Sequence, residues 1–293
     1  MDVLRVFHSG PVDAWRDRER ALVRRGHSVT LLSARRWTEG GSLVELTTRP
    51  GEDTRAVGTL GSHPNLFLYD PRPLWRALGR RWDVIDIHEE PCSLATAEVR
   101  LFARLRRQRA PITLYSAQNI VKRYPVPFRW FETAALRAAR GLSACNLEAA
   151  RIALAKGLAG NARVIPLGID TDLFAPSAAD QPRRGVVGYV GRFDAHKGLS
   201  VLMDAMALAP ELGLELVGAG PMDAQVRARA TELGGHRVVV RGPLGQDALP
   251  GFYRSIDVLA VPSLDTPSWR EQFGRVVVEA MACGTPVVAS DGG

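Results

Sequence analysis

The 293-residue sequence contains few cysteines and no long apolar run. Cys92, Cys145 and Cys283 are odd in number and lack the spacing of a metal site or redox pair, which predicts reduced thiols in the protein core. No segment approaches the roughly 18 apolar residues of a membrane-spanning helix. The opening residues, MDVLRVFHSG, predict a short strand and not a signal peptide. Together these absences predict a cytoplasmic, globular protein.

Lysine is also scarce, although the chain is basic. Only Lys122, Lys156 and Lys197 are lysines, and arginine supplies the remaining positive charge of a chain whose formal net charge is +7. This charge permits anionic lipids or phosphate-bearing molecules as partners but does not require them. We expect no nucleic-acid partner.

The length predicts two α/β domains, because the chain exceeds one ordinary domain and repeats strand–helix units. In the first half we expect strands at 3–8, 28–33, 65–69, 82–88, 112–116 and 142–146, with helices at 15–25, 129–140 and 147–156. Residues 35–65 have a weak pattern and predict a variable region of turns. In the second half, strands are expected at 186–190, 214–217 and 238–241. The segment 176–184, rich in Ser, Ala, Gln and Pro, predicts a linker between domains 1–175 and 185–293.

The segment SWREQFGRVVVEAMACG, residues 268–284, carries the strongest chemical signal. The residues after Phe273 and Gly274 predict a helix that is apolar on every side, and such a helix belongs in the interior. Glu279 interrupts it, and a buried carboxylate is costly unless a partner hydrogen-bonds to it. Glu271 precedes the helix, whose N-terminal amides suit a phosphate. The pattern fits either a nucleotide-sugar site or an ordinary helix with one exposed glutamate.

A second signal is GRFDAHKG, which follows the strand predicted at 186–190. Arg192 and Lys197 flank a turn at the start of a helix, an arrangement that suits a diphosphate. A simple pair of surface charges is the alternative. Gly218 and Gly220 follow the next strand, where glycine lets the backbone approach a ligand closely. A dinucleotide fingerprint needs a third glycine and a later acidic residue, so an NAD-linked oxidoreductase is disfavoured.

These motifs occur in the order typical of retaining GT-B glycosyltransferases, and the chain resembles glycosyltransferase family 4 along nearly its whole length. The resemblance rests on Glu271-x7-Glu279, on the G-R-x4-K-G segment, on RRGHSVTLL, and on the P-x-G-x-D-x-x-x-F segment that ends at Phe174. It implies two Rossmann-like domains that face each other across a cleft. It also implies transfer of a sugar from a UDP- or GDP-sugar to an unknown glycan, lipid or small-molecule acceptor, in a bacterial-type enzyme without a cofactor or metal. We therefore reject a metal site at Asp170-x-Asp172.

The resemblance assigns expected roles to individual residues. Arg192 and Lys197 hold the donor diphosphate and stabilise it as it leaves, Glu271 accepts hydrogen bonds from the donor sugar, and Glu279 accepts them from the ribose. His88, at the end of its strand, is an acceptor-side or reaction-centre candidate. The expected catalytic residues are His88, Arg192, Lys197 and Glu271; the expected donor residues are Gly191, Arg192, Lys197, Gly218, Gly220, Leu244, Glu271, Phe273, Gly274 and Glu279; and the expected acceptor-side residues are Gly10, His88, Asn119, Lys122 and Tyr124.

Three further expectations concern membrane contact, the C-terminal end of the chain and catalytic activity. The segment 98–109 predicts a basic amphipathic helix with Leu101, Phe102 and Leu105 on one side. We favour a solvated outer helix over one that lies on an anionic membrane, at its inner face. The chain stops at VVASDGG, where family members continue, so we expect a C-terminally truncated member with an incomplete second domain. Only Gly10 stands where the family carries two glycines, which keeps open a non-catalytic protein that binds nucleotide-sugars or glycans.

Overall fold

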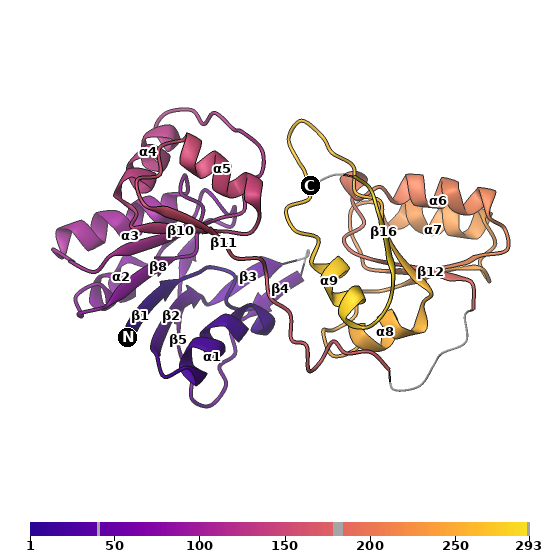
Figure 1. Cartoon of the computed structure of the whole chain (residues 1–293), viewed down its shortest axis with the longest axis horizontal. Coiled ribbons are helices and arrows are strands. Elements are labelled where there is room, and N and C mark those ends of the chain that lie inside the picture. The colour runs from indigo at the N-terminus through magenta and orange to yellow at the C-terminus, as the bar shows by residue number, and fades with distance from the viewer. Residues whose placement is uncertain (40–41, 178–183, 292–293) are drawn as a thin grey trace. The chain divides into compact units, whose positions relative to one another are not determined.

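A computed structural model describes residues 1–39, 42–177 and 184–291 of the chain, which divides into two compact units, Met1–Pro166 and Leu167–Gly293 (Figure 1). The division falls earlier than the expected boundary at residue 175. Phe174, which is only 1% exposed, belongs to an apolar cluster of the second unit, and the carbonyl of Ala175 accepts a hydrogen bond from Arg254. Most of the expected linker lies outside the described residues.

The first unit is built on a seven-stranded parallel sheet with the order β11-β10-β9-β8-β1-β2-β5. Its strands are β1 (Asp2–Val6), β2 (Ser28–Ala34), β5 (Asp53–Val57), β8 (Val84–Ile87), β9 (Ile112–Ser116), β10 (Gly141–Ala144) and β11 (Asn161–Val164). The expected strands are therefore present with small shifts at their ends.

The region 35–65 differs from its prediction, because it contributes β5 to the main sheet beside β2. Two short antiparallel pairs accompany it: β3 (Arg36–Glu39) with β4 (Ser42–Glu45), and β6 (Thr59–Leu60) with β7 (Leu68–Tyr69). The strand expected at 65–69 is thus only β7, outside the main sheet. The pattern of β5, DTRAV, hid this strand because only Val57 is buried.

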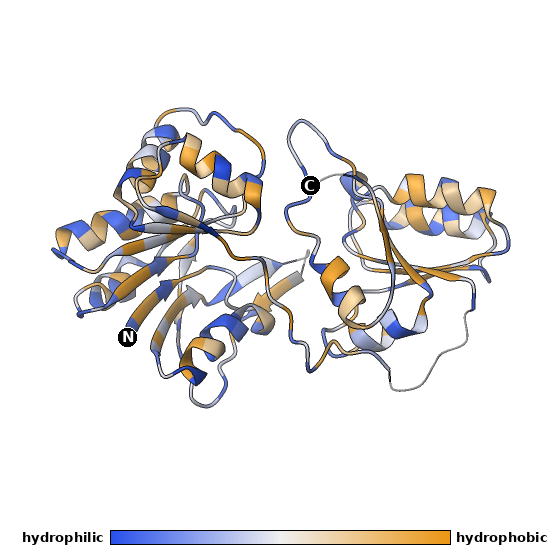
Figure 2. Ribbon diagram, viewed as in Figure 1, coloured by the Kyte–Doolittle hydropathy of each residue, from blue (hydrophilic) through white to orange (hydrophobic). Residues whose placement is uncertain are grey.

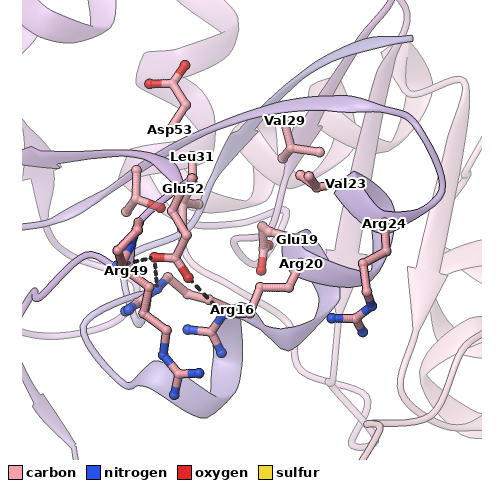
Figure 3. Close-up of a pocket in the computed structure, with 13 residues that line it drawn as sticks. Arg16, Glu19, Arg20, Val23, Arg24, Val29, Leu31, Arg49, Glu52 and Asp53 are labelled. Carbon is pink, nitrogen blue, oxygen red and sulfur yellow. Dashed lines mark hydrogen bonds and ion pairs between the residues drawn. The ribbon is translucent and has the colours of Figure 1, made fainter.

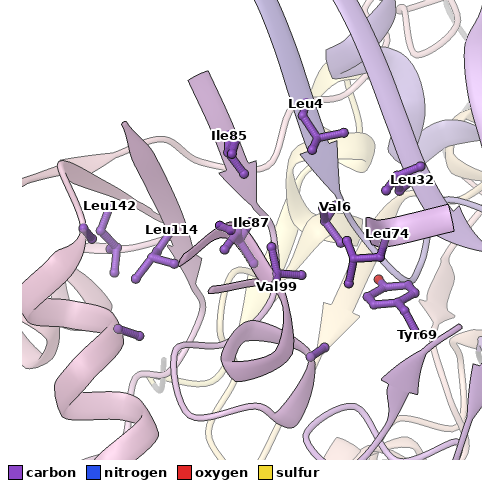
Figure 4. Close-up of a cluster of buried hydrophobic side chains, with 14 of the residues drawn as sticks. Leu4, Val6, Leu32, Tyr69, Leu74, Ile85, Ile87, Val99, Leu114 and Leu142 are labelled. Carbon is purple, nitrogen blue, oxygen red and sulfur yellow. The ribbon is translucent and has the colours of Figure 1, made fainter. Parts of the chain in front are cut away.

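One face of the first sheet forms the main core. Leu4, Val6, Ile85, Ile87 and Leu114 point to the same side of neighbouring strands and pack against four helices (Figure 4). The helices are α2 (Pro71–Ala77), α3 (Leu94–Leu105), α4 (Phe128–Ala138) and α5 (Leu147–Ala155). The 3-10 helix η1 (Asp13–Arg16) leads into α1 (Asp17–Arg24), which contacts β2.

The opposite face of the same sheet is polar in its centre. Arg5 of β1 pairs with Asp86 of β8 at 2.9 Å and with Glu19 of α1 at 2.5 Å. Thr113 of β9 donates to the second oxygen of Asp86 at 2.8 Å. Buried charges need such partners, so these ion pairs offset the charges of a layer that a parallel sheet usually fills with apolar residues.

The second unit is a five-stranded parallel sheet with the order β14-β13-β12-β15-β16. Its strands are β12 (Val186–Val190), β13 (Gly213–Val217), β14 (Val238–Arg241), β15 (Val258–Val261) and β16 (Val287–Ala289). Helices α6 (Leu199–Leu208) and α7 (Asp223–Glu232) pack in one apolar cluster, and α8 (Leu249–Ser255) and α9 (Arg275–Ala282) pack in another. Figure 2 shows the mainly hydrophobic strands of both units beside helices that carry hydrophilic residues.

Two helices present different faces from those predicted. In α9, Glu279 and Ala280 are buried but Met281 is 62% exposed, so the helix is amphipathic and not apolar on all sides as expected. In α3, Leu101 and Leu105 are 53% and 57% exposed, whereas small residues and Val99 face the core.

Among the described residues, no helix combines the length and apolar character required to cross a membrane. All three cysteines are free and buried, as predicted.

Candidate active site

The candidate donor residues of the second unit lie at the point where the order of strand addition reverses in its sheet. The chain builds β12, β13 and β14 toward one edge and then returns to place β15 on the other side of β12. Ligands of open α/β sheets bind at the carboxyl ends of strands at such a switch point. The loop after β12 carries Arg192 and Lys197, and the loop after β15 carries Ser263 and Glu271.

Lys197 and Glu271 meet directly at this edge. The Lys197 Nζ atom lies 2.7 Å from Glu271 Oε2 and 4.7 Å from the centre of the Trp269 ring, while Ser263 donates to the same carboxylate oxygen at 3.3 Å. Burial alone would raise the pKa of Glu271, but the hydrogen bond and charge of Lys197 lower it below its ordinary value. The structure thus joins two residues, 74 positions apart, that the sequence placed in one site.

Arg192 is the more accessible cation of the pair. Its side chain is 52% exposed, and its nearest carboxylate, that of Asp194, is 3.6 Å away and also contacts His196 at 3.0 Å. The Arg192 carbonyl accepts a hydrogen bond from Tyr189 at 2.9 Å, which fixes the backbone from which the guanidinium extends. The guanidinium can therefore bind an anion without first breaking a buried ion pair.

Three glycines make the close approach of these loops feasible. Gly198, at φ +70°, starts α6, and a Cβ there would lie 1.8 Å from the carbonyl oxygen of Pro262. Gly218, at φ +149°, would place a Cβ 1.9 Å from the carbonyl oxygen of Gly191, and Gly220 faces the backbone of Phe193. The sequence predicted that Gly218 and Gly220 leave room for a ligand. In the structure, their lack of a side chain leaves room for the backbone of a neighbouring loop.

Glu279, which the resemblance assigns to the ribose, already has two partners within the protein. Its side chain accepts a hydrogen bond from Tyr253 at 2.8 Å and lies 2.8 Å from Nε of Arg275, and the residue is only 4% exposed. Burial is the main reason that its pKa is raised, opposed by Arg275 and by the hydrogen bond from Tyr253. The alternative of an exposed glutamate was wrong, because Glu279 is buried against α8, which supplies a tyrosine partner that the local sequence of α9 does not reveal.

The remaining donor-side residues lie at the start of α9 and in the loop after β14, and their contact with a donor stays a prediction. Gly274, at φ +68°, precedes the first residue of α9, and no side chain caps that helix end. Phe273 is half-buried beside it, and Leu244, in the loop after β14, packs partly against the apolar cluster of α8 and α9.

Asp170 caps a turn by accepting from the amides of Asp172 and Leu173 at 2.9 and 3.3 Å. Its carboxylate therefore has a structural role.

In the first unit the switch point lies between β1 and β8, and His88 stands there as predicted. Its ring stacks on Tyr115 with a centroid distance of 3.8 Å, meets Phe7 edge-on at 4.6 Å, and lies 3.4 Å from Nη1 of Arg18 through Nδ1. Burial above all, and then the charges of Arg5, Arg18 and His8, hold the pKa of His88 well below 6.5. His88 is therefore a neutral imidazole at ordinary pH.

The sequence analysis missed a second histidine at this edge. His8 follows β1, and its Nδ1 lies 2.5 Å from Oε2 of Glu89, which follows β8. Glu89 Oε1 also accepts from the His8 amide and from the Tyr69 hydroxyl, each at 2.7 Å. Burial would lower the pKa of His8, but the charge and hydrogen bond of Glu89, with the charge of Glu39, raise it. The sequence did contain a signal for this pair, because His8 and Glu89 each come just after a strand.

The other acceptor-side candidates are not brought to one point. Gly10 packs against Ser33, and its carbonyl accepts from Arg16 at 2.5 Å, so its small size serves packing. Asn119 is buried, Lys122 is exposed, and the Tyr124 hydroxyl donates to Gln118 at 2.8 Å. A contact of these three residues with an acceptor stays a prediction.

Comparison with known proteins agrees with this arrangement. The model of Glycosyltransferase Family 4 matches residues 15–173, more than half of the chain, and that of Glycosyl transferases group 1 matches residues 171–293. A D-inositol 3-phosphate glycosyltransferase of Corynebacterium jeikeium is 38% identical over 151 residues, which cover 44% of this chain and 35% of that protein. The chain thus spans about a third of the length of the curated relatives it matches.

Solved structures show the same fold at lower identity. Sucrose-phosphate synthase from Thermosynechococcus elongatus is 24% identical, with a TM-score of 0.68 over 99% of this chain and 81% of that one. An Anabaena protein solved with UDP and glucose is 21% identical, with a TM-score of 0.62 over 100% and 81%. With its two parallel-sheet units and matching family models, this chain belongs to glycosyltransferase family 4 and has the GT-B fold.

Proposed function

We propose that the protein transfers a sugar from a nucleoside-diphosphate sugar to a hydroxyl acceptor, with retention of anomeric configuration and without a metal ion. The observation that carries this proposal is the ion pair of Lys197 with Glu271 at the carboxyl edge of β12 and β15, with the exposed Arg192 in the same loop as Lys197. Two cations and one carboxylate within a single loop cluster match a donor that combines a diphosphate with sugar hydroxyls.

The chemistry follows from where charge develops. As the bond between the anomeric carbon and the diphosphate breaks, negative charge accumulates on the departing phosphate oxygens. The acceptor hydroxyl oxygen forms the new bond to the anomeric carbon, and its proton passes to a departing phosphate oxygen. Arg192 and Lys197 offset that charge, which is the task a metal ion performs in other active sites. In the unliganded protein Lys197 is neutralised by Glu271 at 2.7 Å. Arrival of the diphosphate draws Lys197 toward phosphate and releases Glu271 to accept hydrogen bonds from the donor sugar.

The proposed role of Glu279 changes with its environment. With Tyr253 and Arg275 as partners, its main task is to join α8 to α9 and so to fix the start of α9 after Gly274. A ribose hydroxyl can still donate to this carboxylate, whose oxygens accept more than one hydrogen bond each.

For the acceptor we propose a polyol that carries a phosphate ester, since a related protein is named for D-inositol 3-phosphate.

Contact with an anionic membrane is a further part of this proposal. The exposed Leu101 and Leu105 alternate on α3 with Arg100 and Arg104, and Arg106 stacks over the Trp75 ring at 5.0 Å. Apolar side chains among arginines suit the interface of an anionic bilayer.

The test is nucleotide binding. Isothermal titration with UDP, GDP and ADP should identify one preferred nucleoside diphosphate, and Arg192→Ala should weaken its binding by roughly tenfold or more, as a charge-assisted contact is lost. Arg227→Ala, on the exposed surface of α7, is the matched control and should leave the affinity unchanged. Equal affinity in the wild type and in an Arg192→Ala, Lys197→Ala double variant that remains folded would refute the donor site. The configuration of the product, read by NMR, then tests retention.

A further inference from the structure

The arginines of η1 and α1 differ in how their charges are satisfied. Arg16 and Arg20 both lie within ion-pair distance of Asp13 and Glu52, as Figure 3 shows for part of this network. Arg18, between them in sequence, reaches the switch point of the first sheet, where its one side-chain hydrogen bond among the described residues joins it to the His88 ring. No carboxylate of the described chain lies within ion-pair distance of it.

The charge of Arg18 is therefore poorly compensated. Burial is the largest cause that lowers its pKa, and the charge of Arg5 lowers it further. Asp86 and Glu19 act in the opposite direction, but both are paired with Arg5, at 2.9 and 2.5 Å. A partly buried cation without a counter-ion costs free energy, and such groups gather at sites that bind ligands.

The contact between Arg18 and His88 also fixes the hydrogen on the imidazole. Arginine only donates, so Nδ1 of His88, 3.4 Å from Nη1 of Arg18, must accept. Because the pKa of His88 lies well below 6.5, the ring is neutral and its hydrogen resides on Nε2. Arg18 is half-buried and His88 is 8% exposed, and among the described residues neither side chain makes a further hydrogen bond or ion pair.

The side-chain nitrogens of this pair that have no partner among the described residues are thus all hydrogen-bond donors, at the edge of the sheet where ligands bind. A group that only accepts hydrogen bonds and carries negative charge is their complement. We propose that Arg18 and His88 form an oxyanion subsite at the carboxyl ends of β1 and β8, which holds a phosphate or carboxylate group of the sugar acceptor. This inference rests on the proposed transfer reaction and assigns the anionic group of its acceptor to two residues of the first unit.

The experiment uses the whole chain with ¹⁵N-labelled histidine, so that His88 is observed separately from the other five histidines. Assignment comes from a His88→Asn variant. The free protein should show His88 neutral with hydrogen on Nε2. Titration with inorganic phosphate should shift that resonance in the wild type and equally in Arg192→Ala, which lacks the proposed donor cation. Arg18→Ala should weaken this binding at least tenfold, whereas Arg24→Ala, an exposed position on the same helix, should not.

Further ligands separate the sources of the oxyanion. Acetate should compete if a carboxylate suffices and fail to compete if phosphate is required, while neutral glucose should not displace either. A nucleoside diphosphate that loses tenfold in affinity in Arg18→Ala would assign the subsite to the donor and overturn the inference. A His88 ring that carries its hydrogen on Nδ1, or that does not respond to phosphate, would overturn it too. If nucleotide binding still depends on Arg192 in that case, the proposed transfer stands without the acceptor subsite.

Discussion

The partners of Glu279 lead to a quantitative prediction about the second unit. Replacing Glu279 by alanine removes the acceptor of the fully buried Tyr253 hydroxyl and the counter-ion of Arg275. Breaking a buried pair by removal of one partner costs about 3–5 kcal/mol. The Arg275 side chain keeps 19% of its surface exposed and can turn to water, so the lower limit applies. We expect the free energy of unfolding to fall by about 3 kcal/mol, which lowers the melting temperature by roughly 10 °C.

Two companion variants test whether the loss comes from these partners. Glu279→Gln keeps an acceptor for Tyr253 and should cost only about 1 kcal/mol, the value of one hydrogen bond. A double-mutant cycle with Tyr253→Phe should give a coupling energy of about 0.5–3 kcal/mol, because the two side chains touch. Independent effects of the two substitutions would show that their contact contributes nothing.

The cost of Glu279→Ala should also depend on pH. Burial raises the pKa of Glu279 in the folded protein above 4.5, so the folded state holds this proton more tightly than the unfolded chain. Its contribution to stability is then fully present below the unfolded pKa and is lost as the pH rises through the folded value. The destabilisation by alanine should therefore be larger near pH 4.5 than at pH 8.

Urea unfolding, with hydrogen exchange of the α8 and α9 amides, measures the stability of this cluster, and titration calorimetry measures nucleotide affinity in the same variants. We expect a large loss of stability and no more than a modest loss of affinity per folded molecule. Unchanged stability together with a tenfold loss of affinity would refute the structural role and return Glu279 to the ligand.

Three other predictions follow from the remaining sites. Transferase activity should persist after exhaustive chelation, because Arg192 and Lys197 supply the positive charge; loss in EDTA that magnesium or manganese restores would contradict this. His8 has a raised pKa, so its contribution to stability is present below pH 6.5 and lost as the pH rises through the folded value. Unfolding free energies at pH 6 and 8 should therefore differ less in His8→Gln than in the wild type, and an unchanged difference would argue against the His8–Glu89 pair. Leu101→Ser with Leu105→Ser should weaken sedimentation with anionic vesicles at least tenfold, since each buried leucine is worth about 1.5–3 kcal/mol; Leu208→Ser, an exposed leucine of α6, is the control, and equal binding of all three proteins would exclude α3 as the membrane surface.

The amino-acid sequence by itself determined the two α/β units, most of their strands and the donor loops. Strands such as Val186–Val190 and Ile112–Ser116 were predicted with their observed limits, because runs of β-branched residues between turn signals are local features. The resemblance to the family also placed Arg192, Lys197 and Glu271 in one site, and in the structure Lys197 and Glu271 do meet.

Only the tertiary structure decided which partners these side chains meet. The Tyr253 hydroxyl reaches Glu279 from another helix, and His8 meets Glu89 from 81 residues away, contacts that no local pattern encodes. The same holds for α3, where the pattern placed Leu101 on the apolar side, but small residues and Val99 face the core. Local periodicity reflects how a segment is buried, whereas the identity of a buried partner depends on strand order and helix packing, which the whole chain sets together.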